Sequence, residues 1–129
     1  MKINLYESGR VTVYNKNFDD LKPFIDNVFK NTDEILRLYA DEEYINNIKN
    51  NYSAIEIEFS EAKPFQSSAT GLINLKKIFI PLSGDLAGNQ DSPIVTLIIG
   101  ENSEYISSPF RANNALNSLN EMVSFVKKP

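Results

Sequence analysis

Residues 94–99 are an apolar run that constrains the fold more than any other stretch of the chain. The run is mostly β-branched, and Pro93 and Gly100 stop it on either side. It is too short for an independent helix, so it predicts a strand, buried on both faces, at the centre of a sheet. A second apolar run lies at 78–82, and the polar, glycine-containing segment 83–92 between the two predicts a long loop.

Strand patterns also occur near both ends of the chain. Residues 2–6 and 10–14 alternate in polarity around Gly9, which predicts a β-hairpin with a tight turn. Residues 72–80 predict a long strand with a bulge or bend at its two central lysines. Residues 104–107 predict a short final strand.

Three acidic segments mark possible helix starts. Apolar residues at helical spacing follow Asp19 and Asp20, and Pro23 fits only a first helical turn, so the first helix is expected to begin at Asp19 or Asp20. Similar signals at 32–34 and 41–43 predict two further helices or one helix with a kink.

The C-terminal segment carries an apolar stripe at helical spacing, with Asn113 or Asn114 as the expected cap. Combined with the strand patterns, this predicts a single α+β domain over residues 1–129. We expect a mostly antiparallel sheet of about five to six strands, with an N-terminal helical segment and the C-terminal helix packed on it.

The chain contains no cysteine and no histidine. Thiol nucleophiles, cysteine-based metal sites and imidazole acid–base catalysis are therefore excluded, and no cofactor or metal is expected. No segment approaches the roughly 18 apolar residues of a membrane span, and the start of the chain alternates in polarity instead of forming a signal-peptide block. We expect a cytoplasmic protein without membrane partners.

The formal net charge of −4 lies entirely in the first half of the chain. Residues 1–66 hold 12 Asp and Glu against 8 Lys and Arg, whereas residues 67–129 hold 5 of each. A nucleic-acid-binding protein needs a basic face to displace counterions from phosphate. The sequence offers no such face, so nucleic acid is not an expected partner.

The clearest acidic pattern is in residues 55–59, where the polarity alternates with a period of two. Glu56 and Glu58 are expected on one wet strand face, extended by Glu61 into a row of negative charge. The row has three interpretations: a solvated face that discourages aggregation, a ridge that binds a partner, or a carboxylate pair about 7 Å apart that catalyses a reaction.

Four further acidic residues are candidate partner contacts. Asp85 and Asp91 lie in the predicted loop, where their spacing does not match a calcium-binding EF-hand. Glu42 and Glu43 lie at a predicted helix start, where the helix dipole alone accounts for negative charge.

In its size, its acidity and the style of the strands at 55–59 and 78–85, the chain resembles small acidic bacterial immunity proteins. The resemblance implies an inhibitor that binds a cognate toxin domain, often a basic nuclease, through an acidic surface. Acidic inhibitors of this kind gain association rate from electrostatic steering.

Three functional hypotheses follow. The first is a non-enzymatic protein-binding inhibitor. The second is a small-ligand or enzymatic domain, which requires a concave pocket with aromatic walls and converging carboxylates. The third is a homo-oligomeric accessory protein that pairs an exposed sheet edge across a two-fold axis, and we expect a monomer or a weak homodimer.

Overall fold

The fold is built on one antiparallel sheet, seen in a computed structural model that describes residues 1–106 and 108–128. The strands of the described residues are β1 (Lys2–Glu7), β2 (Arg10–Asn15), β3 (Thr32–Ile35), β4 (Ser53–Ser67), β5 (Gly71–Pro81), β6 (Val95–Gly100) and β7 (Phe110–Ala112). The helices are α1 (Phe18–Lys30), α2 (Glu42–Asn51) and α3 (Leu116–Lys127).

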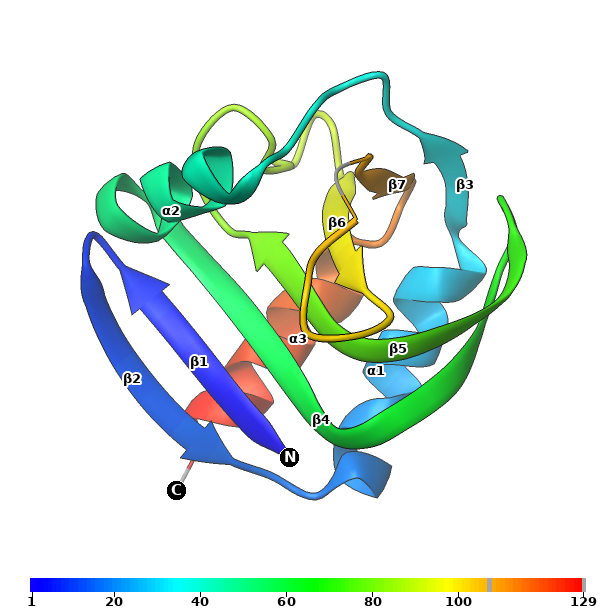
Figure 1. Cartoon of the computed structure of the whole chain (residues 1–129), viewed down its shortest axis with the longest axis horizontal. Coiled ribbons are helices and arrows are strands. Elements are labelled where there is room, and N and C mark those ends of the chain that lie inside the picture. Colours follow the sequence, from blue (N-terminus) through cyan, green and yellow to red (C-terminus); the bar gives the residue numbers. More distant parts are fainter. Residues whose placement is uncertain (107, 129) are drawn as a thin grey trace.

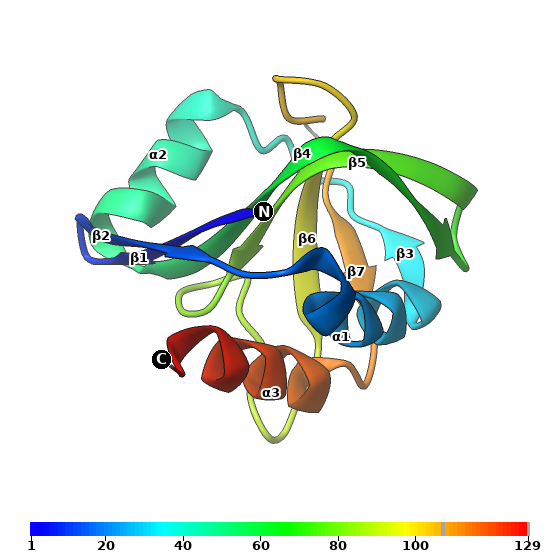
Figure 2. The ribbon, with the colours of Figure 1, turned by 90° about the horizontal axis from the view of Figure 1, so that it is seen from below.

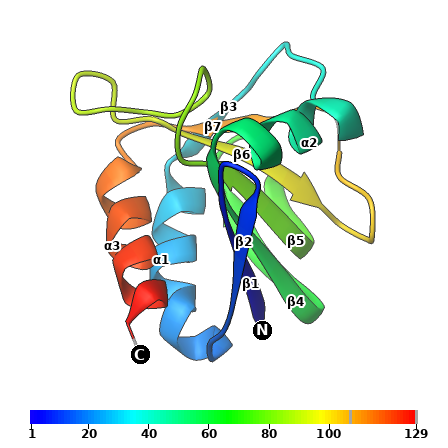
Figure 3. The same ribbon diagram turned by 90° about the vertical axis from the view of Figure 1, so that its left-hand side faces the viewer.

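The sheet has the strand order β2-β1-β4-β5-β6-β7-β3 (Figure 1), with every neighbouring pair antiparallel. Helices α1 and α3 lie side by side on one face (Figure 3), and α2 covers part of the other face (Figure 2). The predicted α+β class and antiparallel sheet are confirmed. The sheet has seven strands instead of five to six because β3 adds an unexpected edge.

Both faces of β6 are buried, as its composition predicts. Val95, Leu97 and Ile99 belong to the larger core between the sheet and the helices α1 and α3. Ile98 belongs to a smaller cluster beneath α2, where it packs with Phe79. The central position of the sheet is held by β5, with β6 next to it.

The predicted N-terminal hairpin is confirmed. Its two-residue turn, Ser8 and Gly9, has positive φ at both positions, which matches the twist of the flanking strands. The turn is fixed to the end of α2, because the Ser8 N–H donates to the Tyr52 carbonyl and the Gly9 N–H to the Lys49 carbonyl, each at 3.0 Å.

The helix predictions are confirmed in part. Helix α1 begins at Phe18, before the expected start at Asp19 or Asp20, so Pro23 lies beyond its first turn. Helix α2 begins after Asp41, whose carboxylate accepts a hydrogen bond from the Tyr44 N–H at 2.9 Å. Helix α3 begins after Ala115, without a side-chain cap from either predicted asparagine.

The predicted helix start at 32–34 is wrong, since these residues open strand β3. Helix α1 ends at Lys30 with Asn31 as its C-cap, and the buried hydroxyl of Thr32 donates to the Val28 carbonyl as the chain leaves the helix. The following residues then pair with β7, with Glu34 opposite Arg111. Ladder pairing with a distant strand therefore overrides a local helix signal.

Two further strand predictions need correction. The irregularity expected at Lys76 and Lys77 lies on the partner strand, where the register shifts between Glu58 and Lys63 of β4. No strand forms at 104–106, Ser107 lies outside the described residues, and the following strand is β7 instead. Among the described residues, no helix has the length and apolar character needed to cross a membrane.

The burial of β6 on both faces can be tested with alanine. Because Ile98 and Ile99 point to opposite cores and are both almost fully buried, Ile98→Ala and Ile99→Ala should each lower the free energy of unfolding by about 2–5 kcal/mol in urea titrations. Leu72→Ala is the control, since Leu72 is 66% exposed, and should change it by less than about 0.5 kcal/mol. A negligible effect of Ile98→Ala would mean that α2 does not cover the sheet.

Candidate functional site

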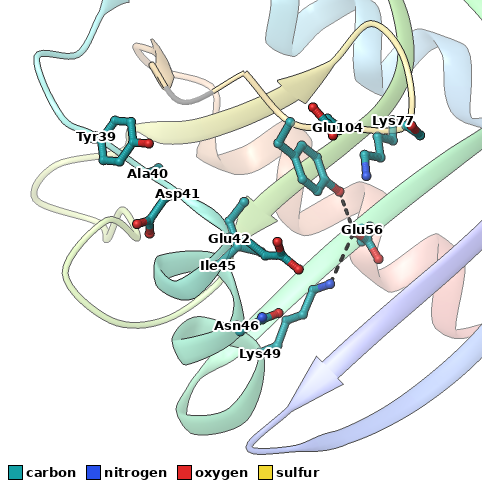
Figure 4. A pocket seen from close by; sticks show the side chains of 12 residues that line it. Tyr39, Ala40, Asp41, Glu42, Ile45, Asn46, Lys49, Glu56, Lys77 and Glu104 are labelled. Atoms are coloured by element: carbon teal, nitrogen blue, oxygen red, sulfur yellow. Dashed lines mark hydrogen bonds and ion pairs between the residues drawn. The ribbon is translucent and has the colours of Figure 1, made fainter.

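A pocket of about 550 Å³ opens on the α2 face of the sheet (Figure 4). Three segments that are distant in sequence form it: residues 39–49 at the start of α2 and along it, the strands β4 and β5, and residues 103–105 in the loop after β6. Four carboxylates and two lysines line it: Asp41, Glu42, Glu56, Glu104, Lys49 and Lys77. We call this the α2 pocket.

Glu56 forms the inner wall of the α2 pocket. It lies on β4 in register with Asn4 of β1 and Phe79 of β5, and only 6% of the residue is exposed. The expectation that Glu56 belongs to a wet, outward row of charge is therefore wrong. The alternation of β4 does place Glu56 away from the main core, but α2 and the loop after β6 cover that face.

The carboxylate of Glu56 is the acceptor for donors from three other segments. The Tyr105 hydroxyl donates to Oε2 at 2.5 Å, and the Tyr6 hydroxyl and Asn4 Nδ2 donate to Oε1 at 2.9 and 3.0 Å. Lys49 of α2 completes the shell with an ion pair of 3.6 Å. A buried charge is tolerated only when it is paired and hydrogen-bonded in this way.

These contacts fix the protonation states of the site. Burial raises the pKa of Glu56, but the hydrogen bonds from Tyr105 and Asn4 and the charge of Lys49 outweigh it, so the pKa lies below the ordinary 4.5. Burial and the negative charge of Glu56 raise the pKa of both Tyr6 and Tyr105. At neutral pH the carboxylate is ionised and both tyrosines remain hydrogen-bond donors.

The two lysines are held against aromatic rings. Lys49 Nζ lies 4.9 Å from the ring centroid of Tyr6, and Lys77 Nζ lies 4.1 Å from that of Tyr105. Each tyrosine ring therefore has a lysine ammonium group over its face, while its hydroxyl donates a hydrogen bond to the Glu56 carboxylate. Hydrogen bonds, one ion pair and these cation–π contacts therefore join the side chains of the inner wall of the α2 pocket.

The rim of the α2 pocket is more negative and more exposed than its wall. Glu42 and Glu104 are both exposed, and they reach the pocket from opposite sides, one from α2 and one from the loop after β6. Tyr39 stands on the rim with 71% of its surface exposed. An exposed aromatic ring beside carboxylates suits a cationic group.

The structure brings together only two of the predicted partner-binding residues, Glu42 and Glu56, in one pocket. Glu43 is exposed on α2 without lining the pocket. Glu58 is half-buried on β4, where it accepts a hydrogen bond from Asn4 and pairs with Lys2 at 3.7 Å.

The other predicted residues lie elsewhere. Glu61 is exposed within the irregular stretch of β4. Asp85 lines a hollow of about 80 Å³ beside Tyr44, and Asp91 lies at the exposed tip of the loop between β5 and β6. Glu61, Asp85 and Asp91 therefore do not converge with Glu56. Among the described residues, no group of three or more carboxylates is placed to hold a metal ion.

Sequence reasoning missed the donors that surround Glu56: Asn4, Tyr6, Lys49 and Tyr105. The polarity of residues 2–6 alternates along the sequence, which places Asn4 and Tyr6 on one strand face. This pattern indicated that the face carries polar groups. Tyr105 lies in an irregular loop, and no spacing in the sequence connects it to β4. Its part in the site depends on the tertiary fold alone.

Comparison of the chain with known protein families, with curated proteins and with solved structures found no match.

The Glu56 network should be visible in the stability of the protein. Glu56→Gln replaces an acceptor oxygen with an amide group that faces other donors, so it should lower the free energy of unfolding at neutral pH by about 1–3 kcal/mol. Because the folded-state pKa of Glu56 lies below 4.5, its stabilising contribution is complete above that value and is lost as the pH falls through the folded-state pKa.

Urea titrations across an acid pH series would measure both effects. In Glu56→Gln, the free energy of unfolding should lose the part of its acid dependence that Glu56 contributes. Glu61→Gln is the matched control, since Glu61 is exposed, and should stay within about 0.5 kcal/mol of the wild type. Equal stability of Glu56→Gln and the wild type at neutral pH would contradict the buried network.

Proposed function

We propose that the chain is a non-enzymatic binding protein whose α2 pocket receives a basic side chain from a protein partner. We propose further that it acts as a bacterial immunity protein, which neutralises a cognate toxin, in the cytoplasm and without a cofactor. The observation that carries the proposal is the concave site itself, where Glu42, Glu104 and the exposed ring of Tyr39 surround a pre-formed pocket.

The protonation states favour binding over proton transfer. A general acid or base works best with a pKa near the operating pH. The pKa of Glu56 is lowered away from neutrality, and those of Tyr6 and Tyr105 are raised away from it. Glu56 is also occupied by four donors, so its function is to fix the shape and charge of the wall.

The charge of the α2 pocket indicates the chemistry of its ligand. Four carboxylates against two lysines leave a formal charge of −2, and both lysines are already engaged with rings and with the inner wall. An arginine or lysine of the partner would meet Glu42 and Glu104 at the rim and stack on Tyr39. Buried aromatic and arginine anchors of this kind dominate the binding energy of protein interfaces.

We thus propose that the partner contacts the acidic rim of the α2 pocket, and not a row of Glu56, Glu58 and Glu61 along β4. Glu43 would extend the contact along α2. Glu58 and Glu61 on β4, and Asp85 and Asp91 in the loop after β5, lie outside the pocket. They remain proposed contacts of the outer footprint, where charge affects the association rate more than the affinity.

A second candidate is a small-ligand site, which is favoured by one observation. The pocket volume of about 550 Å³ lies within the range of small-molecule sites, about 300–1,000 Å³. Such a ligand would also carry a cationic group, so free arginine is a direct probe. A rise in melting temperature with millimolar arginine that Glu104→Lys abolishes would favour this candidate.

The partner hypothesis predicts charge-dependent association. With the product of the gene directly upstream as the test partner, Glu104→Lys should slow association, measured by surface plasmon resonance at low salt, by about tenfold. Tyr39→Ala should weaken binding mainly through faster dissociation, because it removes a proposed anchor. The wild-type protein should also protect cells that express that gene product.

Glu121→Lys is the matched control, because it makes the same charge change at an exposed position of α3, on the opposite face of the sheet (Figure 2). It should leave association nearly unchanged, and melting curves should show that all variants fold. Equal loss of on-rate in Glu104→Lys and Glu121→Lys would reject the α2 pocket as the contact. Turnover of a substrate would reject the non-enzymatic proposal.

A further inference from the structure

Strand β2 is a free sheet edge with exposed apolar side chains. It ends the strand order, and no segment within residues 1–106 and 108–128 pairs with its outer side. Val11 and Val13 are 49% and 51% exposed, and both project to the α2 face, as their ladder partners Tyr6 and Asn4 do. This edge therefore combines unpaired backbone groups with an apolar surface.

The opposite edge of the sheet is protected and β2 is not. Strand β3 has four residues, exposes the charges of Asp33 and Glu34, and pairs irregularly with β7. Short length, charge and bulges are the means by which proteins block edge pairing. Strand β2 has six regularly paired residues, with its only charged side chain, Arg10, at one end.

The hairpin geometry determines which backbone groups of β2 face outward. A two-residue turn is closed by a hydrogen-bonded pair, here Glu7 and Arg10, and hydrogen-bonded pairs then alternate with non-hydrogen-bonded ones. Arg10, Thr12 and Tyr14 therefore direct their N–H and C=O groups toward β1. The N–H and C=O groups of Val11 and Val13 point away from the sheet.

We propose that β2 pairs antiparallel with β2 of a second copy of this chain, with Thr12 opposite Thr12 on a two-fold axis perpendicular to the sheet. Val11 of each copy then lies opposite Val13 of the other. Both pairs exchange backbone hydrogen bonds through the groups that point outward. The four valines also form one apolar patch on the α2 face, which covers surface that each monomer exposes.

Charge and contact select this register from its neighbours. Residues that lie opposite each other must point to the same face of the joined sheet. The neighbouring registers that still pair the outward backbone groups therefore place Val11 or Val13 on the axis. With Val13 on the axis, Arg10 lies opposite Lys16, and like charges repel. With Val11 on the axis, Val13 lies opposite Gly9 and loses its apolar contact. With Thr12 on the axis, Arg10 meets the ring of Tyr14 instead.

The resulting dimer would be weak, because one pair of short strands buries less area than a standard interface. Its symmetry keeps the α2 faces of both copies on the same side of the joined sheet. The α2 pocket stays open, since β1 separates β2 from β4, which carries Glu56. The proposal does not depend on the function proposed for that pocket.

Cysteine cross-linking tests both the edge and the register, because the wild-type chain has no cysteine. Cα atoms in a non-hydrogen-bonded pair are about 4.5 Å apart, which is within the range that a disulfide spans. Oxidised Thr12→Cys should therefore form a covalent dimer on non-reducing gels. Val11→Cys, Val13→Cys and the exposed control Asn117→Cys on α3 should stay largely monomeric.

The cross-link has clear contrary outcomes. Covalent dimers of Val11→Cys or Val13→Cys alone would overturn the register. Equal cross-linking of all four variants, or of none, would overturn the paired edge. As an independent measurement, sedimentation of the cysteine-free wild type should show a mass that rises toward the dimer with concentration.

Val13→Pro removes an outward N–H without removing a hydrogen bond to β1. It should therefore abolish the rise of mass with concentration, while the melting curve shows a folded protein. Ile35→Lys on the opposite edge, where Ile35 is 53% exposed, should leave the rise unchanged. A wild type that stays monomeric up to millimolar concentration, or a rise that only Ile35→Lys abolishes, would overturn the proposal.

Discussion

The ionised carboxylate of Glu56 is the constraint that organises the second face of the sheet. An isolated buried charge costs several kcal/mol, so the side chain is stable only where donors converge on it. Those donors come from β1, from α2 and from the loop after β6. The α2 pocket is therefore a consequence of the same contacts that hold these segments over the sheet.

The parts of the fold that could be predicted from sequence are those with a local physical cause. The turn at Ser8 and Gly9, the cap at Asp41 and the apolar composition of β6 each specify structure within a few residues. Strand β3 could not be predicted this way, because its strand state comes from pairing with β7. Its local sequence reads as a helix start, and distant pairing decides the outcome.

In the candidate site too, the local sequence predicted one property and the tertiary fold decided the other. Alternation in β4 correctly placed Glu56 away from the main core, but solvent exposure was a separate inference and it was wrong. Whether such a face is wet depends on what covers it. The cover comes from Lys49 and Tyr105, which lie on opposite sides of β4 in the sequence, and period-two patterning carries no information about either.

The attachment of the hairpin turn to α2 links the sheet edge with the pocket. The Ser8 and Gly9 amides donate to carbonyls at the end of the helix, and one of those carbonyls belongs to Lys49, whose side chain meets Glu56. Hydrogen exchange at these two amides thus requires the hairpin tip and the end of α2 to separate. Both amides would exchange through this one separation, with a shared opening free energy.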